Sequence, residues 1–374
     1  MPELRDAVIV AATRSAIGRA HKGSLANKRA DELLADILKG LMASVPSVPV
    51  EDIQDIIAGN VAQSGETGFN IARTAGILAG FPLSVPGHTV QRFCASSLQA
   101  ITIAANAVKV GEGDVYIACG VEKASQPPLA EGEAPPARRG PGPGGANPEL
   151  TGGHGFPNVY IPMGLTAENV ADQFGVKRTD MDAFAALSQN RAESSLASGY
   201  FASEITPITK DDGTVVSVDD SPRAGTTAET LATLKPAFRP EGGTVTAGNS
   251  CPMNDGAAGV LVMSAEAAAR YGLKPLARIV ATAYSGNNPE IMGVAPIEAI
   301  GNVLAKTGMT IGDIDIVELN EAFAAQVLPV CEKTGVDIEG QLNPFGGAIA
   351  LGHPFGMTGA RIMTTLIHGL QTRD

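Results

Sequence analysis

The feature that most constrains the fold is an alternation of short apolar runs with amphipathic helices. The runs are brief and rich in β-branched residues, a pattern that predicts strands buried on both faces. They are DAVIVAA (6–12), IQDIIAGNV (53–61), VYIACGV (115–121), GVLVMSA (259–265), LARIVATAY (276–284) and IDIVELN (314–320). Helical periodicity occupies 30–45, 96–108, 184–195 and 296–308. The alternation predicts an α/β fold whose sheets are covered by helices.

The alternation contains an internal repeat. DIQDIIAGNVAQ (52–63) is echoed by DIDIVELNEAFAAQ (313–326), since each has an acidic turn, an apolar strand, an asparagine and a small-residue stretch ending in glutamine. After each echo a turn opens a helix, and these turns hold Cys94 in the first half and His353 in the second. The sequence therefore predicts two similar halves whose equivalent turns share a site at a pseudo-two-fold axis.

Cys94 lies where a predicted strand gives way to a helix. The helix is indicated by Leu98, Ile101, Ala105 and Val108, which recur at three- and four-residue steps. A helix N-terminus has unpaired N–H groups and a partial positive charge, and both favour a thiolate. From these residues alone, a reactive thiol and a buried cysteine acting as a small hydrophobe are equally good interpretations.

His353 lies in the glycine-rich stretch NPFGGAIALGHPFGMTGAR (343–361), directly before a predicted helix. Glycines on both sides let the backbone and a ligand approach closely, which favours a functional histidine over a structural one. A cysteine beside an imidazole is the arrangement of an activated thiol nucleophile. Asn320 ends the predicted strand 314–320, where α/β folds present side chains to ligands.

A segment of different texture, about 122–248, separates the two halves. Its first part, 126–150, is so rich in proline and glycine that it predicts an irregular surface excursion. The remainder contains helical stretches. We interpret the whole segment as an insertion that folds over something.

Composition excludes several classes of function. A net charge of -12 and a pI of 4.9 argue against nucleic acid or an anionic membrane as the main partner. Four cysteines without a CxxC pair predict reduced thiols, and five histidines without ligand spacing give no case for a metal. We find no signal peptide and no apolar run of membrane-spanning length, so we expect a cytoplasmic protein.

Seven ordered blocks of the sequence resemble the thiolase family nearly from end to end. They are VIVAATRSAIGRAHKGSLA (8–26), RFCASSLQA (92–100), PMGLTAENVA (162–171), SPRAGTTAETLATLKPAF (221–238), GTVTAGNSCPMNDGAA (243–258), ELNEAFAAQ (318–326) and 343–361. The resemblance implies an α/β fold of duplicated βαβαβαββ halves in a five-layer α-β-α-β-α arrangement with an inserted loop domain.

The resemblance also implies a division into domains. Residues 1–121 form the N-terminal thiolase half, which is completed by about 249–270. Residues 122–248 form the loop domain that covers coenzyme A, and 271–374 form the C-terminal half. The family is at least dimeric, so we expect a homodimer or a homotetramer.

The same matching implies the roles of the site residues. Cys94 becomes acylated, His353 takes the Cys94 proton and faces an oxyanion, and Asn320 holds a water that completes that oxyanion hole. No metal and no permanently bound cofactor is implied, because coenzyme A is itself a substrate.

Four further residues are implied to bind coenzyme A. Arg223 corresponds to the arginine that contacts the nucleotide end. Met163, Ser250 and Cys251 correspond to residues that line the pantetheine channel.

The implied reaction is the thiolytic, reversible cleavage of 3-ketoacyl-CoA to acetyl-CoA and a shortened acyl-CoA. Pro162 is typical of the degradative branch, which serves fatty acid β-oxidation, whereas the acetoacetyl-CoA-forming branch typically has histidine there. That biosynthetic activity and an impaired acyl-CoA-binding protein remain alternatives. A ketosynthase-like condensing enzyme would need a second histidine in place of Asn320, and the motif LNEAF argues against it.

The sequence departs from the family pattern at several positions. Gln91 and Ser97 replace the usual asparagine and glycine, and we expect Ser97 to narrow the acyl pocket. Cys251 stands where serine is common and adds a second thiol near the substrate. The family ends with a strand containing a C-x-G-G-G-type motif, and this sequence stops before it. A chain without that cysteine, the usual acid/base for the α-carbon, should form a Cys94 adduct yet perform thiolysis poorly.

Overall fold

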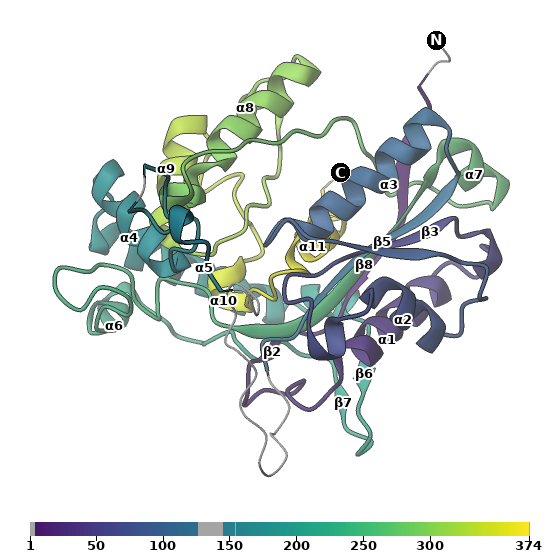
Figure 1. Ribbon diagram of the computed structural model, residues 1–374, viewed down its shortest axis with the longest axis horizontal. Helices are drawn as coiled ribbons and strands as arrows, with labels where there is room; N and C mark the ends of the chain where they lie inside the picture. Colours follow the sequence, from purple (N-terminus) through teal and green to yellow (C-terminus); the bar gives the residue numbers. More distant parts are fainter. Residues whose placement is uncertain (1–3, 126–144, 154, 374) are drawn as a thin grey trace.

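One mixed sheet forms the centre of the protein (Figure 1). The computed structural model describes residues 4–125, 145–153 and 155–373. The strand order is β4-β3-β5-β8-β1-β9, in which β4, β3 and β5 are parallel and the other pairs antiparallel. The strands are β1 (Ala7–Arg14), β3 (Asp55–Gly59), β4 (Gly87–Val90), β5 (Val115–Glu122), β8 (Asn254–Ser264) and β9 (Ala277–Arg278). A short strand β2 (Gly18–Arg19) also pairs with β8.

Two pairs of helices cover the faces of this sheet. Helices α1 (Ala30–Ala43) and α2 (Ile71–Leu78) lie on one face, and α3 (Ser96–Val110) and α11 (Thr358–Leu370) on the other (Figure 1). Successive residues of a strand point to opposite faces. Accordingly Ile56 and Ile117 belong to the core beneath α1, whereas Ile57 and Ala118 belong to the core beneath α3. Both faces are therefore buried, as the apolar runs predict.

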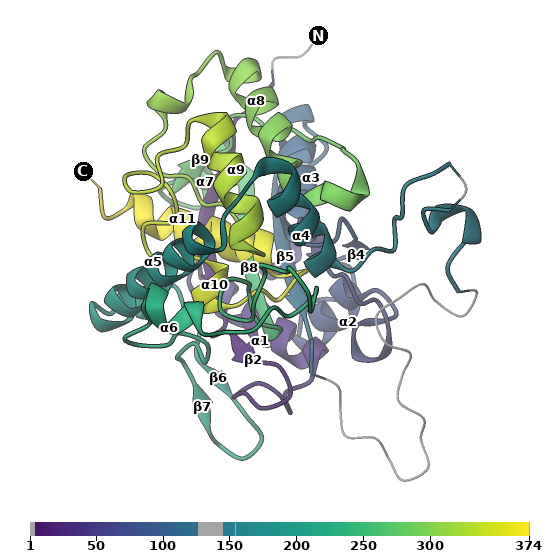
Figure 2. The same ribbon diagram turned by 90° about the vertical axis from the view of Figure 1, so that its left-hand side faces the viewer.

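A second group of helices packs beside the sheet around its own apolar core, on the left in Figure 1 and facing the viewer in Figure 2. They are α4 (Met163–Phe174), α5 (Arg178–Ala197), α6 (Ala228–Ala232), α9 (Ala324–Thr334) and α10 (Ala348–Leu351). Helix α8 (Pro296–Thr307) packs on α9 and has no buried residue. Helix α7 (Ala265–Arg270) follows β8, and β6 (Ile208–Thr209) pairs with β7 (Val215–Val216). Short 3-10 turns occupy Val50–Asp52, Gly65–Thr67, Pro148–Leu150, Tyr200–Ser203, Pro289–Val294 and Ile311–Asp313.

Two of the six predicted strands are wrong as regular strands. Of 276–284 only β9 pairs, and 314–320 forms a single bridge, between Val317 and Leu342. The reason is that the Asn343 side chain uses both backbone groups of Leu319. Asn343 Oδ1 accepts a hydrogen bond from the Leu319 N–H, and Asn343 Nδ2 donates one to the Leu319 carbonyl, both at 2.8 Å. Side-chain bonds thus replace a ladder along this segment.

The predicted surface excursion at 126–150 lies outside the described residues apart from 145–150, which end in the turn Pro148–Leu150. The rest of the interval 122–248 contains α4, α5, α6 and the β6–β7 hairpin.

Helix α3 departs from the expectation that no run reaches membrane-spanning length. By length and composition, the window Phe93–Val110 is apolar enough to cross a membrane, with a mean hydropathy of 1.2. Half of this window is buried, however, and α3 packs on β3, β5, β8 and α11. Buried core helices pass the same test, so we describe α3 as a core helix.

The N-terminal ends of α3 and α11 lie in direct contact. The Ala360 N–H donates to the Ser97 hydroxyl at 2.9 Å, and a Cβ on Gly359 would overlap the Leu98 backbone. Only glycine at 359 therefore permits this approach.

We predict that Gly359→Ala destabilises the protein by about 1–3 kcal/mol or more, because α3 and α11 must move apart. The control is Gly301→Ala in α8, where a Cβ meets open space. That substitution should be neutral or stabilise by about 0.5–1 kcal/mol. Urea unfolding of both variants measures the difference, and equal stabilities would show that the contact is not tight.

Candidate active site

Cys94 is held in a tight turn between β4 and α3. Phe93 adopts a left-handed backbone (φ 46°), an uncommon conformation for such a residue. The Ser96 hydroxyl accepts the Arg92 N–H at 2.8 Å and donates to the Phe93 carbonyl at 2.6 Å, which closes the turn. The half-buried Cys94 thus precedes the N-terminus of α3, whose partial positive charge favours a thiolate. This is the predicted strand-to-helix position.

His353 lies in the loop between α10 and α11 and is almost completely buried. Its backbone N–H donates to Asn254 Oδ1 at 3.0 Å. Gly352 before it has φ 113°, which suits glycine alone, and any side chain there would collide with Asn254. Gly356 packs on the backbone at the ends of β3 and β5. The glycines flanking His353 therefore allow the close packing that the sequence predicts.

The hydrogen bonds of His353 determine which ring nitrogen holds the proton. The Thr358 hydroxyl donates to the Pro354 carbonyl at 2.8 Å and lies 2.6 Å from His353 Nδ1. Because the hydroxyl proton is used on the carbonyl, the hydroxyl oxygen must accept from Nδ1–H. Nε2 is then unprotonated and has a lone pair available as a base.

The surroundings of His353 keep the ring neutral. Burial, assisted by the positive charge of Arg361, lowers the pKa of His353 to about 3. At neutral pH the imidazole is therefore uncharged and can accept a proton from a thiol.

Asn320 contacts the same nitrogen. Its Nδ2 lies 3.2 Å from His353 Nε2, and its Oδ1 is buried without a hydrogen-bond partner among the described residues. The next residue, Glu321, is anchored by Ser188, Asn343 and the Ile349 N–H. The end of 314–320 is thus fixed, and Asn320 has an amide oxygen left to bind something else.

Cys251 joins this group from the loop before β8. Its N–H donates to the Ala322 carbonyl at 3.0 Å, which ties it to the segment that follows Asn320. Burial, and then the charge of Cys94, raise the pKa of the Cys251 thiol. Ser250 bridges to Phe323, and its hydroxyl donates to the Thr246 carbonyl at 2.6 Å.

Arg223 lines a cavity of about 220 Å³. The lining residues come from β2, α5, α6 with its flanking loops, α10 and the loop before β8. They are Arg19, Gln189, Ser221, Arg223, Thr226, Thr230, Leu231, Leu234, Ala247, Gly248, Pro252 and Ile349. The backbone of Arg223 is positioned by a 2.8 Å hydrogen bond from its N–H to Gln189 Oε1. Gly248 and Pro252 flank Ser250 and Cys251, so the cavity adjoins the loop of these two residues.

Met163 begins α4 and is partly exposed. Its neighbour Gly164 packs on the ring of Phe238, and that ring packs edge-on against Phe323 at 5.9 Å between centroids. Phe323 bridges Ser250, so these two phenylalanines connect the start of α4 with the thiol region.

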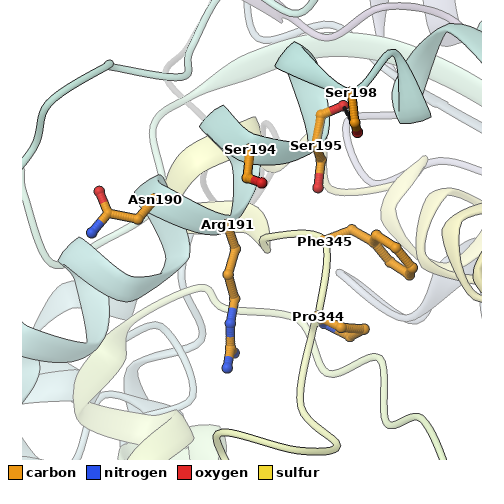
Figure 3. Close-up of a pocket in the computed structure, with 7 residues that line it drawn as sticks. All are labelled: Asn190, Arg191, Ser194, Ser195, Ser198, Pro344 and Phe345. Carbon is orange, nitrogen blue, oxygen red and sulfur yellow. Dashed lines mark hydrogen bonds between the residues drawn. The ribbon is translucent and has the colours of Figure 1, made fainter.

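A larger, open cavity of about 420 Å³ lies elsewhere, between α5 and the segment after Asn343 (Figure 3). It is lined by Asn190, Arg191, Ser194, Ser195, Ser198, Pro344 and Phe345. Arg191 is committed to the carbonyls of Leu342 and Ile338. None of the predicted site residues lines this cavity.

The Ser97 side chain contributes to the packing of the two helices. It is fully buried between them, and its hydroxyl accepts the Ala360 N–H. The narrowing of the acyl pocket by this side chain stays a prediction.

Sequence reasoning missed two residues that the structure places in the site. Thr358 sets the tautomer of His353, and Arg19 adds a second guanidinium to the cavity of Arg223. A threonine at the first position of a helix, five residues after a histidine, is a signal that could have indicated Thr358. Arg19 gave no local signal, because only the fold brings it to Arg223.

The low pKa of His353 predicts a pH-dependent stability. Below about pH 6.5 the histidine of the unfolded chain binds a proton, whereas His353 in the folded chain binds one only near pH 3. The free energy of unfolding therefore decreases as the pH is lowered from about 6.5 toward 3. His353 alone should cost the wild type about 2 kcal/mol between pH 7 and pH 5. Urea unfolding of wild type and His353→Asn at both pH values tests this. A stability difference that does not change with pH would contradict a neutral buried imidazole.

Comparisons with known proteins agree with this arrangement. Residues 7–266 match the thiolase N-terminal domain, and residues 273–374 match the thiolase C-terminal domain. Together the two domains cover nearly the whole chain.

Curated relatives and solved structures belong to the same family. A β-ketoadipyl-CoA thiolase of Acinetobacter baylyi is 44% identical over 98% of this chain and 94% of its own length. A 3-ketoacyl-CoA thiolase of Saccharophagus degradans is 44% identical over 99% and 93%.

Two solved structures share the fold. The acetyl-CoA acetyltransferase of Bacillus anthracis superposes with a TM-score of 0.88 at 40% identity, covering 100% of this chain and 94% of its own. The dimeric peroxisomal thiolase of Saccharomyces cerevisiae gives 0.89 at 40% identity, covering 98% and 91%. This chain, with its duplicated α/β fold, belongs to the thiolase family.

Proposed function

We propose that the protein cleaves 3-ketoacyl-CoA by thiolysis through an acyl-enzyme on Cys94, with His353 as the base. The observation that supports these roles best is the neutral imidazole, whose unprotonated Nε2 lies beside Asn320 in the region where the α3 and α11 turns meet. Membership of the family establishes the acyltransferase activity and makes coenzyme A a substrate rather than a bound cofactor.

The first half-reaction transfers the acyl group to the enzyme. His353 Nε2 takes the proton of Cys94, and the thiolate attacks the 3-keto carbon. The bond between the α- and β-carbons then breaks, so that the acyl group stays on sulfur as a thioester and the enolate of acetyl-CoA leaves. The enolate gains one proton, which balances the proton lost by the thiol.

The costly species is the enolate, because negative charge develops on its thioester oxygen. The protonated Nε2 of His353 and a water held by the free Oδ1 of Asn320 are the donors that we assign to this oxygen. One such preorganised donor contributes roughly 3–4 kcal/mol.

The second half-reaction releases the acyl group. The thiol of coenzyme A loses its proton and attacks the Cys94 thioester, which gives the shortened acyl-CoA and restores the thiolate. A thioester suits this step, because it is reactive enough to be passed on again.

We assign the nucleotide end of coenzyme A to the cavity of Arg223 and Arg19. Two guanidinium groups attract phosphates, and such groups recognise them through paired N–H donors. From this cavity, Gly248 and Pro252 lead to Ser250 and Cys251, so pantetheine would follow this loop toward Cys94. Met163 and Phe238 would form the opposite wall.

The degradative direction, with a place in fatty acid β-oxidation, is our proposal for the pathway. The names of the relatives, 3-ketoacyl-CoA thiolase and β-ketoadipyl-CoA thiolase, support cleavage over the biosynthetic and non-catalytic alternatives. A cytoplasmic location stays a prediction.

We propose a homodimer built on the open edge of β4. The solved yeast relative is dimeric. In this chain Phe69 is 98% exposed with φ 53°, and Asn70 beside it has φ 62° and donates to the Gly87 carbonyl of β4. An exposed aromatic residue held next to an unpaired strand edge is typical of a surface covered by another chain.

Two substitutions separate the proposed chemistry from the proposed binding. Cys94→Ser should abolish acyl-enzyme formation from a 3-ketoacyl-CoA, because a hydroxyl is not deprotonated by this imidazole. Arg223→Ala should still form the acyl-enzyme, but the KM for coenzyme A should rise with a smaller change in kcat. Intact-mass spectrometry and steady-state kinetics measure these effects.

The matched control is Cys251→Ser, which changes the neighbouring thiol and should leave the acyl adduct on Cys94. If the Cys94→Ser variant formed as much acyl adduct as the wild type, Cys94 would not be the nucleophile. A collapse of kcat at unchanged KM in Arg223→Ala would place Arg223 in the chemistry instead.

A further inference from the structure

A buried pair of opposite charges lies beneath the proposed active site. Glu318 precedes Asn320 by two residues, and Arg361 follows Thr358 by three residues on α11. Arg361 Nη1 lies 3.6 Å from Glu318 Oε2, and the two side chains are 1% and 2% exposed. Each charged residue thus lies two or three positions from a residue that contacts the His353 ring, Asn320 or Thr358.

Among the residues that the structure describes, one other arginine is paired while fully buried, and it differs from this pair. Arg14 donates to both oxygens of Asp219 at 2.7 and 2.9 Å and to Glu204 at 2.5 Å, so its guanidinium is fully bonded. In contrast, among the described residues no group accepts a hydrogen bond from Nε, Nη1 or Nη2 of Arg361 or donates one to either oxygen of Glu318. A buried pair with this geometry gains little stability over an apolar pair of the same volume.

The position of the pair gives it a different consequence. The backbone of 314–320 is bonded by Gln341 and Asn343, which contact Ile314, Val317 and Leu319. On the other side, the Arg373 side chain beyond α11 donates to the Asp315 carbonyl at 3.0 Å. The charge attraction to α11 is an additional restraint on this segment. The Glu318 side chain contacts Arg361 on α11, and the Asn320 side chain contacts His353 in the loop before α11, so both side chains face the same neighbouring segment.

We propose that Glu318 and Arg361 are positioning residues for the thiolase reaction. Their attraction holds the extended segment against α11, and this fixes the Asn320 amide at His353 Nε2. The inference rests on the proposed roles of Asn320 and His353. Both residues act on the His353 ring. Arg361 lies on the same helix as Thr358, which contacts Nδ1, and Glu318 lies on the same segment as Asn320, which contacts Nε2.

The charges also act on the ionisation of the groups around them. Burial raises the pKa of Glu318 and the Arg361 charge opposes that rise, whereas burial lowers the pKa of Arg361. Glu204 and Glu321 are the other carboxyls that influence Arg361, and Arg14 is the other cation. Removing one of the two side chains therefore leaves the other buried without its partner of opposite charge.

The test removes both charges at once, because a single substitution is more apt to prevent folding. The double variant Glu318→Gln with Arg361→Met should fold, as urea unfolding will report. Its kcat should fall about ten- to hundredfold, the effect of a misplacement near 1 Å, with an unchanged KM for coenzyme A. In an Asn320→Ala background the same double substitution should lower kcat by less than about twofold, because the positioned group is gone.

The control is Asp219→Asn, which alters the bonded Arg14 pair. This substitution should lower the urea midpoint. Its effect on kcat should be the same factor in the wild-type background and in the Asn320→Ala background. A folded double variant with wild-type kcat, or an equal loss of kcat in both backgrounds, would overturn the positioning role while leaving the proposed function intact. Wild-type kcat in Asn320→Ala alone would overturn both.

Discussion

The active site depends on one contact, the packing of the N-terminal ends of α3 and α11. A glycine at 359 lets the backbone of α11 touch Leu98, and Ser97 accepts the Ala360 N–H across the same contact. These two helices come from the two halves of the sequence repeat. Because the turn before α3 holds Cys94 and the loop before α11 holds His353, their packing brings a thiol and its base into one region.

Burial then determines the protonation state of His353, the site residue from the second half of the sequence. The His353 ring is desolvated, so it stays neutral, and the Thr358 hydroxyl uses its proton on Pro354 and so selects the Nδ1–H tautomer. A neutral ring with an unprotonated Nε2 can take the proton of a thiol. Without Thr358 the ring could exchange its tautomers, and the lone pair would not be fixed toward Asn320.

The sequence was a good guide to the first half and a poorer guide to the second. The strands around Ile56, Ile117 and Leu261 were predictable, because each apolar run is buried on both faces of a paired strand. The run 314–320 is also rich in β-branched residues, but the Asn343 side chain bonds the backbone of Leu319 and no ladder forms. A single side chain that bonds to a distant backbone leaves no periodic pattern in the sequence, so this loss of strand pairing could not be predicted.

The positions of the site residues were predictable for a related reason. Cys94 and His353 stand in turns marked by glycines and helix starts, and these local signals survive in the fold. The convergence of Arg19 with Arg223 and of Glu318 with Arg361 was not predictable, since residues separated by some 200 and 40 positions meet only through tertiary packing.

The central claim is that His353 is a neutral base with an unprotonated Nε2. Nitrogen NMR of histidine-labelled protein tests it most directly, with His353→Asn used to assign the signal. We expect Nδ1 to be protonated, Nε2 to be unprotonated and neither to titrate between pH 6 and 8. A proton on Nε2 at pH 7, or a charged ring there, would contradict the account.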